Sequence, residues 1–181
     1  QRPAGADGAL PPGLSGGPGR GMDLILWRHA EAQDHPDPEY GMPGDARDLA
    51  RRLTARGEKQ ATRMAAWLDR QLPDGARVWC SPAARCEQTV LPLGRKYKIS
   101  DVIAPDASAH ALLELVQWPS GRSPVVVVGH QPTLGQVIAR LLGLTEEDCP
   151  VKKGALWWLR HRERAGASQT VVVTVQTPEL L

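Results

Sequence analysis

Two short apolar runs dominate the hydrophobic pattern of the chain, at residues 24–27 and 125–128. Each run is continuous rather than alternating, which is typical of a strand that is covered on both faces of a sheet. Segments rich in β-branched and aromatic residues favour further strands. These predicted strands cover residues 77–80, 102–104, 155–160 and 170–176, and a hairpin loop at 163–168 joins the last two.

Apolar residues recur at helical spacing between these runs. The first such stretch predicts a helix over residues 54–71, with Thr54 as a candidate cap. Ser81 followed by Pro82 is typical of an N-cap and a first helical residue, so a second helix is predicted from there to about residue 97. Two more helices are predicted at residues 108–116 and 133–142.

Strands that alternate with helices predict an α/β fold, namely a three-layer sandwich with a mostly parallel central sheet and helices on both faces. Ligands of such folds bind beyond the carboxyl ends of the strands. Three predicted strands are followed there by basic residues or histidines: Arg28 and His29, Arg85, and His130. The polar segment 33–47 is a loop whose length is typical of functional loops.

The chain of 181 residues is long enough for one domain with a substantial core. We expect this domain to span residues 22–181, because residues 1–21 are rich in Gly and Pro and are interpreted as a flexible tail or a cloning remnant. The net charge of +2 gives no strong field toward nucleic acid or a membrane surface. No apolar run is long enough to cross a bilayer. We therefore expect neither nucleic acid nor membrane as a partner.

The three cysteines, Cys80, Cys86 and Cys149, have neither the number nor the spacing of a disulfide framework or a zinc site. They are interpreted as free thiols, which indicates a reducing, cytoplasmic location. The sequence has no His-x-x-x-His pair, no carboxylate cluster of a metal site and no Walker-type phosphate loop. We therefore expect no metal and no cofactor.

The end of the first strand is chemically unusual, because a buried run stops at Arg28 and His29. Burial of positive charge is costly unless an anion neutralises it, and phosphate is the anion that we consider. Arginine suits phosphate because its planar fork donates paired hydrogen bonds and keeps its charge. Arg85 also lies in the first turn of a predicted helix, where free N–H groups favour anions. A neutral histidine can attack phosphorus and carry the phosphoryl group.

Four segments together resemble the histidine phosphatase superfamily, which has a phosphoglycerate mutase-like fold. They are Leu-Trp-Arg-His-Ala-Glu at 26–31, Arg-Arg-Leu-Thr-Ala-Arg-Gly at 51–57, Ser-Pro-Ala-Ala-Arg-Cys-Glu-Gln-Thr at 81–89 and Val-Gly-His-Gln-Pro at 128–132. The second segment is similar to the Arg-Pro-Leu-Thr-x-x-Gly element of the small SixA-type branch. The order and spacing of the four segments are more specific than any one of them.

The resemblance implies roles for the residues at the strand ends. His29 would be the nucleophile that becomes phosphorylated. Arg28 and Arg85 would clamp the phosphate, and His130 would contact the phosphoryl group and steady its charge.

The resemblance also implies that Arg51 is a further phosphate ligand, with Arg47 and Arg52 as competitors for that place. Glu31 is a candidate supporting residue, which would orient the loop or pair with an arginine. The remaining histidines are expected to be surface or structural residues: His35, His110 and His161.

Many members of the family carry an acidic proton donor between the last two motifs, and no carboxylate here matches it. Asp106 and His110 are the candidates in that region. An ester has a poor alkoxide leaving group and needs a general acid, whereas phosphohistidine leaves readily once its ring is protonated. We therefore predict a cofactor-independent phosphatase that acts on protein phosphohistidine. The alternatives are a broad small-molecule phosphomonoesterase and a non-catalytic phosphate- or phosphoprotein-binding module.

Overall fold

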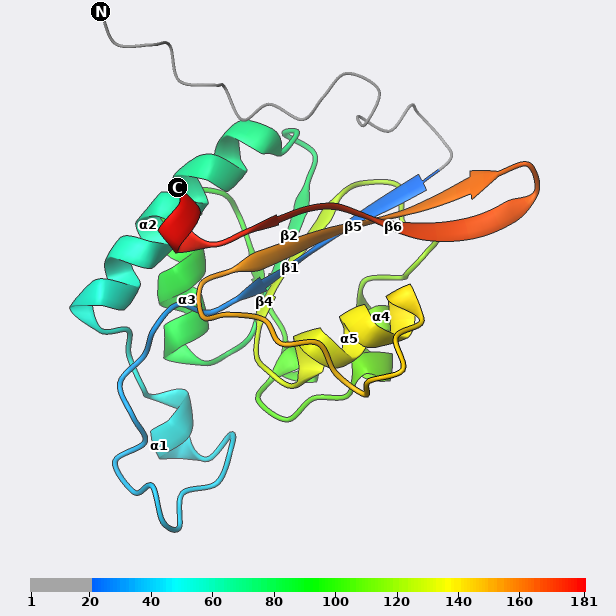
Figure 1. The fold of residues 1–181 in the computed structure, drawn as a ribbon. Coiled ribbons are helices and arrows are strands. Elements are labelled where there is room, and N and C mark those ends of the chain that lie inside the picture. The colour runs from blue at the N-terminus through cyan, green and yellow to red at the C-terminus, as the bar shows by residue number, and fades with distance from the viewer. Residues whose placement is uncertain (1–20) are drawn as a thin grey trace, which may run out of the picture.

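Six strands form one sheet in the order β3-β2-β4-β1-β5-β6 (Figure 1). The computed structural model describes residues 21–181, so the predicted tail lies outside the described residues except for Gly21, and the domain boundary at Met22 stays a prediction. β3, β2, β4 and β1 pair in parallel, and β5 runs antiparallel to both β1 and β6. The strands are β1 (Gly21–Arg28), β2 (Arg77–Cys80), β3 (Lys98–Ile99), β4 (Val125–Gly129), β5 (Leu156–Arg164) and β6 (Ala167–Gln176).

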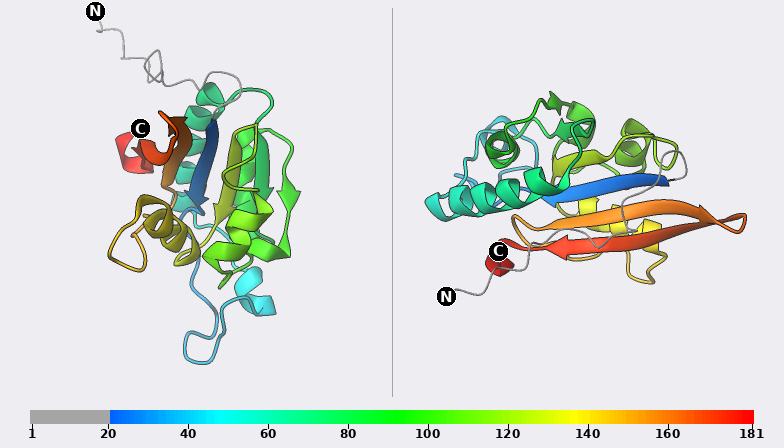
Figure 2. Two further views of the ribbon diagram at one scale, coloured as in Figure 1. Left: turned by 90° about the vertical axis from the view of Figure 1, so that its right-hand side faces the viewer. Right: turned by 90° about the horizontal axis from the view of Figure 1, so that it is seen from above.

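Helices cover both faces of this sheet, as Figure 2 shows, so the predicted three-layer α/β fold is confirmed. α2 and α3 pack on one face, and α4 and α5 pack on the other. None of the helices within residues 21–181 is long and apolar enough to span a membrane. The α-helices are α1 (Ala46–Leu49), α2 (Ala55–Gln71), α3 (Ala84–Val90), α4 (Ala109–Leu115) and α5 (Thr133–Leu142), and short 3₁₀ turns cover Leu91–Leu93, Asp101–Ile103 and Pro178–Leu180.

The continuous apolar run in β1 is explained by the two helical layers. Ile25 and Trp27 belong to the core under α2 and α3, whereas Leu24 and Leu26 belong to the core under α4 and α5. Successive side chains of a strand point to opposite faces, so a strand with helices on both sides must be apolar at every position. The four side chains are completely buried.

The predicted extent of the helix after β2 was wrong at both ends. α3 begins at Ala84 and ends at Val90, and no side chain caps it. The Ser81 hydroxyl is instead close to a histidine ring at the strand edge. Pro92 and Gly94, which has a φ of +69°, bring the chain into a short turn, because proline cannot donate a helical hydrogen bond and glycine accepts a left-handed backbone.

The strand predicted for residues 102–104 was also wrong. This segment lies in a 3₁₀ turn, where Ser100 Oγ accepts a hydrogen bond from the Val102 N–H at 3.2 Å. The edge strand β3 precedes that turn. The hairpin between β5 and β6 is tighter than predicted: Ala165 and Gly166 both have positive φ, as a two-residue primed turn requires.

Gly57 in α2 is expected to resist replacement by alanine. A Cβ atom there would overlap the backbone of Glu31, in the segment that follows β1. Gly57→Ala should therefore lower the free energy of unfolding by about 2–3 kcal/mol, although alanine is intrinsically the better helix former by about 1 kcal/mol. Urea denaturation measures this change. Gly75→Ala is the control, since its Cβ would meet open space. Unchanged stability of Gly57→Ala would contradict the expected overlap.

Candidate active site

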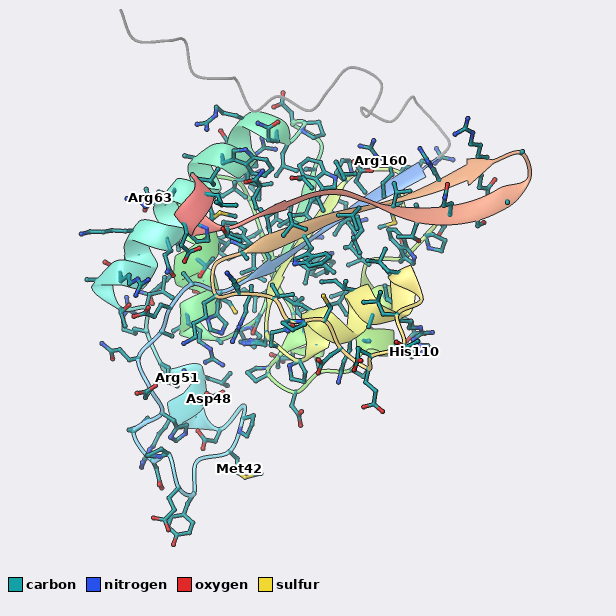
Figure 3. The ribbon with its side chains drawn as sticks, in the orientation of Figure 1. Met42, Asp48, Arg51, Arg63, His110 and Arg160 are labelled. Atoms are coloured by element: carbon teal, nitrogen blue, oxygen red, sulfur yellow. The ribbon has the colours of Figure 1, made fainter. Side chains whose placement is uncertain are left out.

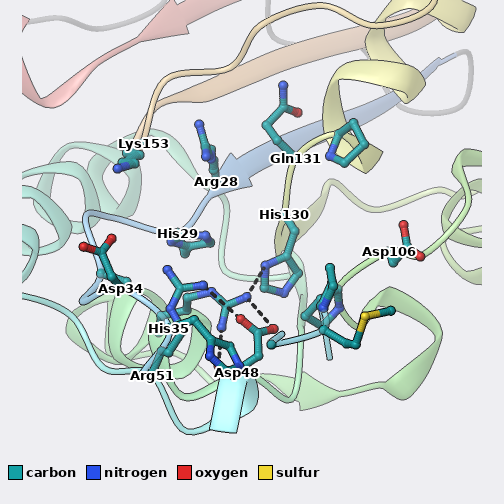
Figure 4. A pocket seen from close by; sticks show the side chains of 17 residues that line it. Arg28, His29, Asp34, His35, Asp48, Arg51, Asp106, His130, Gln131 and Lys153 are labelled. Carbon is teal, nitrogen blue, oxygen red and sulfur yellow. Dashed lines mark hydrogen bonds and ion pairs between the residues drawn. The ribbon is translucent and has the colours of Figure 1, made fainter. Parts of the chain in front are cut away.

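A pocket of about 360 Å³ opens at the carboxyl ends of the central strands (Figure 4). It brings together all four residues that were predicted from the strand ends, and Arg51 lies beside them. Arg47 and Arg52 are exposed and are not part of its lining. The principal lining residues are Arg28, His29, Asp48, Arg51, Arg85 and His130.

His29 is held by its backbone and by its ring. Its N–H donates to the Gly129 carbonyl at 3.2 Å, and its own carbonyl accepts from the Gly154 N–H at 2.9 Å. The ring Nδ1 lies 2.7 Å from the Ala30 carbonyl oxygen. Because a carbonyl can only accept, Nδ1 must carry the proton. The other ring nitrogen, Nε2, therefore holds the lone pair when the ring is neutral.

The surroundings of His29 keep its ring neutral. Burial lowers the pKa of His29 well below its ordinary value of 6.5, and the neighbouring His130, Arg85 and Arg28 lower it further, against the opposing effect of the hydrogen bond to Ala30. A neutral imidazole with its Nδ1 proton fixed has the protonation state of a nucleophile.

His130 approaches His29 from the end of β4, with 5.4 Å between the ring centroids. Arg85 Nη2 lies 3.4 Å from His130 Nδ1, and the Ser81 hydroxyl lies 2.7 Å from His130 Nε2. A guanidinium group only donates, so Nδ1 accepts and Nε2–H donates to Ser81. Burial lowers the pKa of His130 to about 3, and Arg85 contributes to this shift. Arg85 thus fixes the tautomer of His130, and Ser81, which was predicted as a helix cap, accepts the hydrogen bond from Nε2–H.

The guanidinium groups of Arg28 and Arg85 are anchored at their ends. Arg28 Nη1 donates to the Val151 carbonyl at 2.8 Å, and Arg85 Nη1 donates to the Asp48 carbonyl at 2.7 Å. The Nε–H of each arginine is buried and has no hydrogen-bond partner among the described residues. Buried unpaired donors are costly. A pocket so rich in donors suits an oxyanion, which only accepts hydrogen bonds.

Asp48 is a buried pocket residue that the sequence reasoning missed. Its carboxylate accepts from Arg51 Nη1 at 2.9 Å and from Arg85 Nη2 at 3.3 Å, and it also accepts from the Gly44 N–H at 2.8 Å. Burial acts to raise the pKa of Asp48, but these hydrogen bonds and the charge of Arg85 outweigh it and hold the pKa below its ordinary value of 3.8. Asp48 is therefore an ionised anchor between two arginines.

The other candidates lie in different places. Glu31 is outside the pocket lining; its carboxylate accepts from Thr54 Oγ1 at 3.1 Å and lies 3.8 Å from Arg56. Asp106 is exposed and forms part of the pocket wall. His110 is exposed on α4, where it faces Glu114 at 3.6 Å. No group of three or more potential metal ligands occurs within residues 21–181.

His130 is expected to make stability depend on pH. The folded protein keeps the ring neutral down to about pH 3, whereas the unfolded chain binds a proton below about pH 6.5. The unfolded state then holds more protons, so stability falls as pH decreases from about 7 to about 5, with His130 contributing a slope of about 1.4 kcal/mol per pH unit near the lower end. Urea denaturation across this range should show a shallower slope for His130→Gln than for wild type. His110→Gln is the control that keeps the slope, and equal slopes for all three proteins would contradict the expected neutrality of His130.

Comparison with known sequences identifies proteins that are similar to this chain. The sequence model of the histidine phosphatase superfamily (branch 1) matches residues 24–107. A phosphohistidine phosphatase SixA homolog from Haemophilus influenzae is 28% identical over 137 residues, which cover 67% of this chain and 78% of the relative.

Solved structures agree with the fold. A structure named for the phosphohistidine phosphatase SixA, from Nakamurella multipartitia, is 26% identical with a TM-score of 0.65, and the match covers 90% of this chain and 99% of that one. The protein histidine phosphatase SixA in complex with tungstate is 23% identical with a TM-score of 0.65, covering 88% and 99%. A phosphoserine phosphatase from Entamoeba histolytica shares the fold at 17% identity, with a TM-score of 0.65 and coverage of 88% and 100%.

The fold, the family match and the relatives define a phosphatase with a phosphoglycerate mutase-like fold. The chain is similar to the histidine phosphatase superfamily, whose sequence model matches residues 24–107. It is also similar to the small SixA-type proteins.

Proposed function

We propose that the protein hydrolyses phosphohistidine on other proteins, with His29 as the nucleophile. The observation that carries this proposal is the hydrogen bond from His29 Nδ1 to the Ala30 carbonyl, because it leaves the Nε2 lone pair free in a pocket with three arginines. Arg28, Arg51 and Arg85 supply the positive charge that a phosphoryl group requires.

The reaction proceeds in two balanced steps. In the first, His29 Nε2 attacks phosphorus, a P–N bond forms to His29, and the P–N bond to the substrate imidazole breaks. The substrate ring keeps the electron pair of that bond and leaves neutral, because its other nitrogen already carries a proton. In the second step, water attacks phosphorus, the P–Nε2 bond breaks with its electron pair returning to Nε2, and inorganic phosphate leaves with both protons of the water. The Ala30 carbonyl stabilises the positive charge that His29 carries between the steps.

His130 changes its role when the phosphoryl group arrives. Its ring is neutral beside Arg85. A phosphoryl dianion next to it raises its pKa, so that it takes up a proton and donates a hydrogen bond to a phosphoryl oxygen. Ser81 keeps the ring oriented during this change, since its hydroxyl lies 2.7 Å from Nε2.

The carboxyl groups of the pocket favour a phosphoramidate substrate over an ester. The buried carboxyl group of the pocket is that of Asp48. Its contacts with Arg51 and Arg85 keep it ionised, so it has no proton to donate. An ester needs such a donor for its alkoxide, whereas a protonated imidazole does not. The SixA-type relatives, which are named phosphohistidine phosphatases, support the same substrate class. The free thiols Cys80, Cys86 and Cys149 suit a reducing compartment such as the cytoplasm.

A small-molecule phosphomonoesterase is the second candidate, because the exposed Asp106 lies in the pocket wall and offers a carboxyl group for an ester. Parallel assays with a phosphohistidine peptide and an alkyl phosphate ester such as phosphoserine separate the two. We expect kcat/KM for the peptide to exceed that for the ester by at least about tenfold, since the alkoxide of the ester needs a proton that the pocket does not supply. The spontaneous hydrolysis of the peptide is the blank. A preference for the ester would contradict the proposal, and binding of the peptide without turnover would indicate a phosphoprotein-binding module.

A further inference from the structure

A loop of residues 33–45, which we call the acidic loop, stands away from the sheet beside the pocket (Figures 1 and 3). Five of its residues belong to the pocket lining: Asp34, His35, Gly41, Met42 and Pro43. Pro105 and Asp106 belong to the same lining and come from another part of the chain. Any substrate that extends out of the pocket on this side therefore meets the acidic loop.

The acidic loop is held in shape by hydrogen bonds between its own residues. Asp45 accepts from His35 Nε2 at 3.0 Å and from the Met42 N–H at 2.9 Å. The Asp37 N–H donates to His35 Nδ1 at 2.8 Å, and the Gly41 N–H donates to the Asp37 carbonyl at 2.8 Å. A Cβ at Gly41 would overlap the His35 ring, so the chain packs closely against that side chain. The loop is thus preformed, which lowers the entropy cost of binding a partner.

The side chains that this ordered loop presents are apolar and acidic. Tyr40 is 75% exposed and Met42 is 67% exposed, although both lie in a segment fixed by hydrogen bonds. Large apolar side chains that are held exposed beside a site are a mark of interaction surfaces. The loop also carries four acidic residues and no lysine or arginine: Asp34, Asp37, Glu39 and Asp45.

We propose that the acidic loop is the docking surface for the polypeptide that carries the phosphohistidine, and that this polypeptide is basic and apolar next to the phosphorylated residue. This inference rests on the proposed function and names the partner chemistry of the same site. The negative charge of the loop selects a positively charged partner, and Tyr40 provides apolar contact area with few rotatable bonds. Tyr40 and Glu39 are not pocket-lining residues, so they contact only the part of a substrate outside the pocket.

Three phosphoramidate substrates test this proposal: free phosphohistidine, a phosphohistidine peptide flanked by Lys and Leu, and a peptide of equal length flanked by Asp and Ser. Wild type should hydrolyse the Lys/Leu peptide with a kcat/KM at least about tenfold above that for the other two substrates. Tyr40→Ser and Glu39→Lys should each remove most of this advantage, mainly through KM, because each deletes a contact worth about tenfold in affinity. Neither variant should change the turnover of free phosphohistidine.

Leu91→Ser is the matched control, because Leu91 is 60% exposed and lies outside the pocket lining. It should keep the full preference for the Lys/Leu peptide. Equal rates on all three substrates would overturn the docking surface and leave the proposed function standing. The docking surface would also be overturned, and the proposed function kept, if Tyr40→Ser and Glu39→Lys lowered the turnover of free phosphohistidine as much as that of the peptide. If wild type hydrolyses p-nitrophenyl phosphate but none of the phosphoramidates, the proposed function fails, and the docking surface fails with it.

Discussion

Replacement of His29 by alanine is expected to lower kcat/KM for phosphate release by at least about 10³-fold, the scale on which enzymes lose activity when they lose their nucleophile. The substitution removes the Nε2 lone pair, and no other group can take its place in the attack. The His130 ring, 5.4 Å away between centroids, cannot substitute, because its Nδ1 faces Arg85 and its Nε2 faces Ser81. The residual rate should be that of water attack in the arginine-lined pocket.

Two measurements check this expectation. Steady-state phosphate release gives the loss in rate, and rapid quenching with labelled substrate detects a phosphoryl group on the protein that is stable to base and lost in acid, as a phosphoramidate is. Wild type should form this labelled species and His29→Ala should not. His161→Ala is the control, because His161 packs on Trp118 outside the pocket lining, with ring centroids 5.7 Å apart. Labelling of the His29→Ala protein at wild-type level would refute the assignment of the nucleophile.

Replacement of Arg85 by lysine is expected to have the second largest effect, a loss of about 10²–10³-fold in kcat/KM. Enzymes lose activity on this scale when one hydrogen-bond donor to the transition state is removed. The planar fork of Arg85 reaches the Asp48 carbonyl, the Asp48 carboxylate and His130 at once. A lysine ammonium keeps the charge but cannot reproduce this geometry. The loss should appear in kcat as well as KM, because under the proposed function the Arg85 guanidinium would bind the phosphoryl oxygens most strongly in the transition state.

Arg95→Lys is the matched control for this substitution. Arg95 also makes several hydrogen bonds, to Asp69, Leu72 and Pro73, but it is not a pocket-lining residue. It should cost stability without a comparable loss of activity. Thermal unfolding of both variants separates folding defects from lost catalysis. A folded Arg85→Lys protein with wild-type kcat/KM would contradict the role of the guanidinium fork.

The layered fold could be predicted from the sequence because the strongest signals were local. The continuous runs in β1 and β4 require cover on both faces, and the helical spacing in α2 supplies that cover on one side. Predictions from local sequence were wrong where a tertiary contact of the same residue was stronger than its local preference. A Ser-Pro pair predicted a helix start, but the Ser81 side chain lies beside His130, and the helix begins three residues later at Ala84.

The central residues of the site could also be predicted, because the carboxyl ends of parallel strands lie at the same edge of the sheet. Arg28, His29 and His130 follow directly from that rule. Asp48 could not be placed in this way, because its contact with Arg85 joins residues 37 positions apart. Its spacing of three residues from Arg51 gave no reliable signal, because Arg51 lies beyond the end of α1 at Leu49.

The position of Asp48 has a thermodynamic consequence. Its carboxylate accepts hydrogen bonds from Arg51 and Arg85, the two arginines that would also bind a phosphate under the proposed function, and its backbone carbonyl accepts one from Arg85. Asp48 thereby attaches the segment that includes the acidic loop to Arg85. A phosphate that draws these guanidinium groups away from Asp48 loosens the attachment of that segment. By linkage, a partner that shifts the segment changes the affinity for phosphate by the same factor as phosphate changes the affinity for the partner.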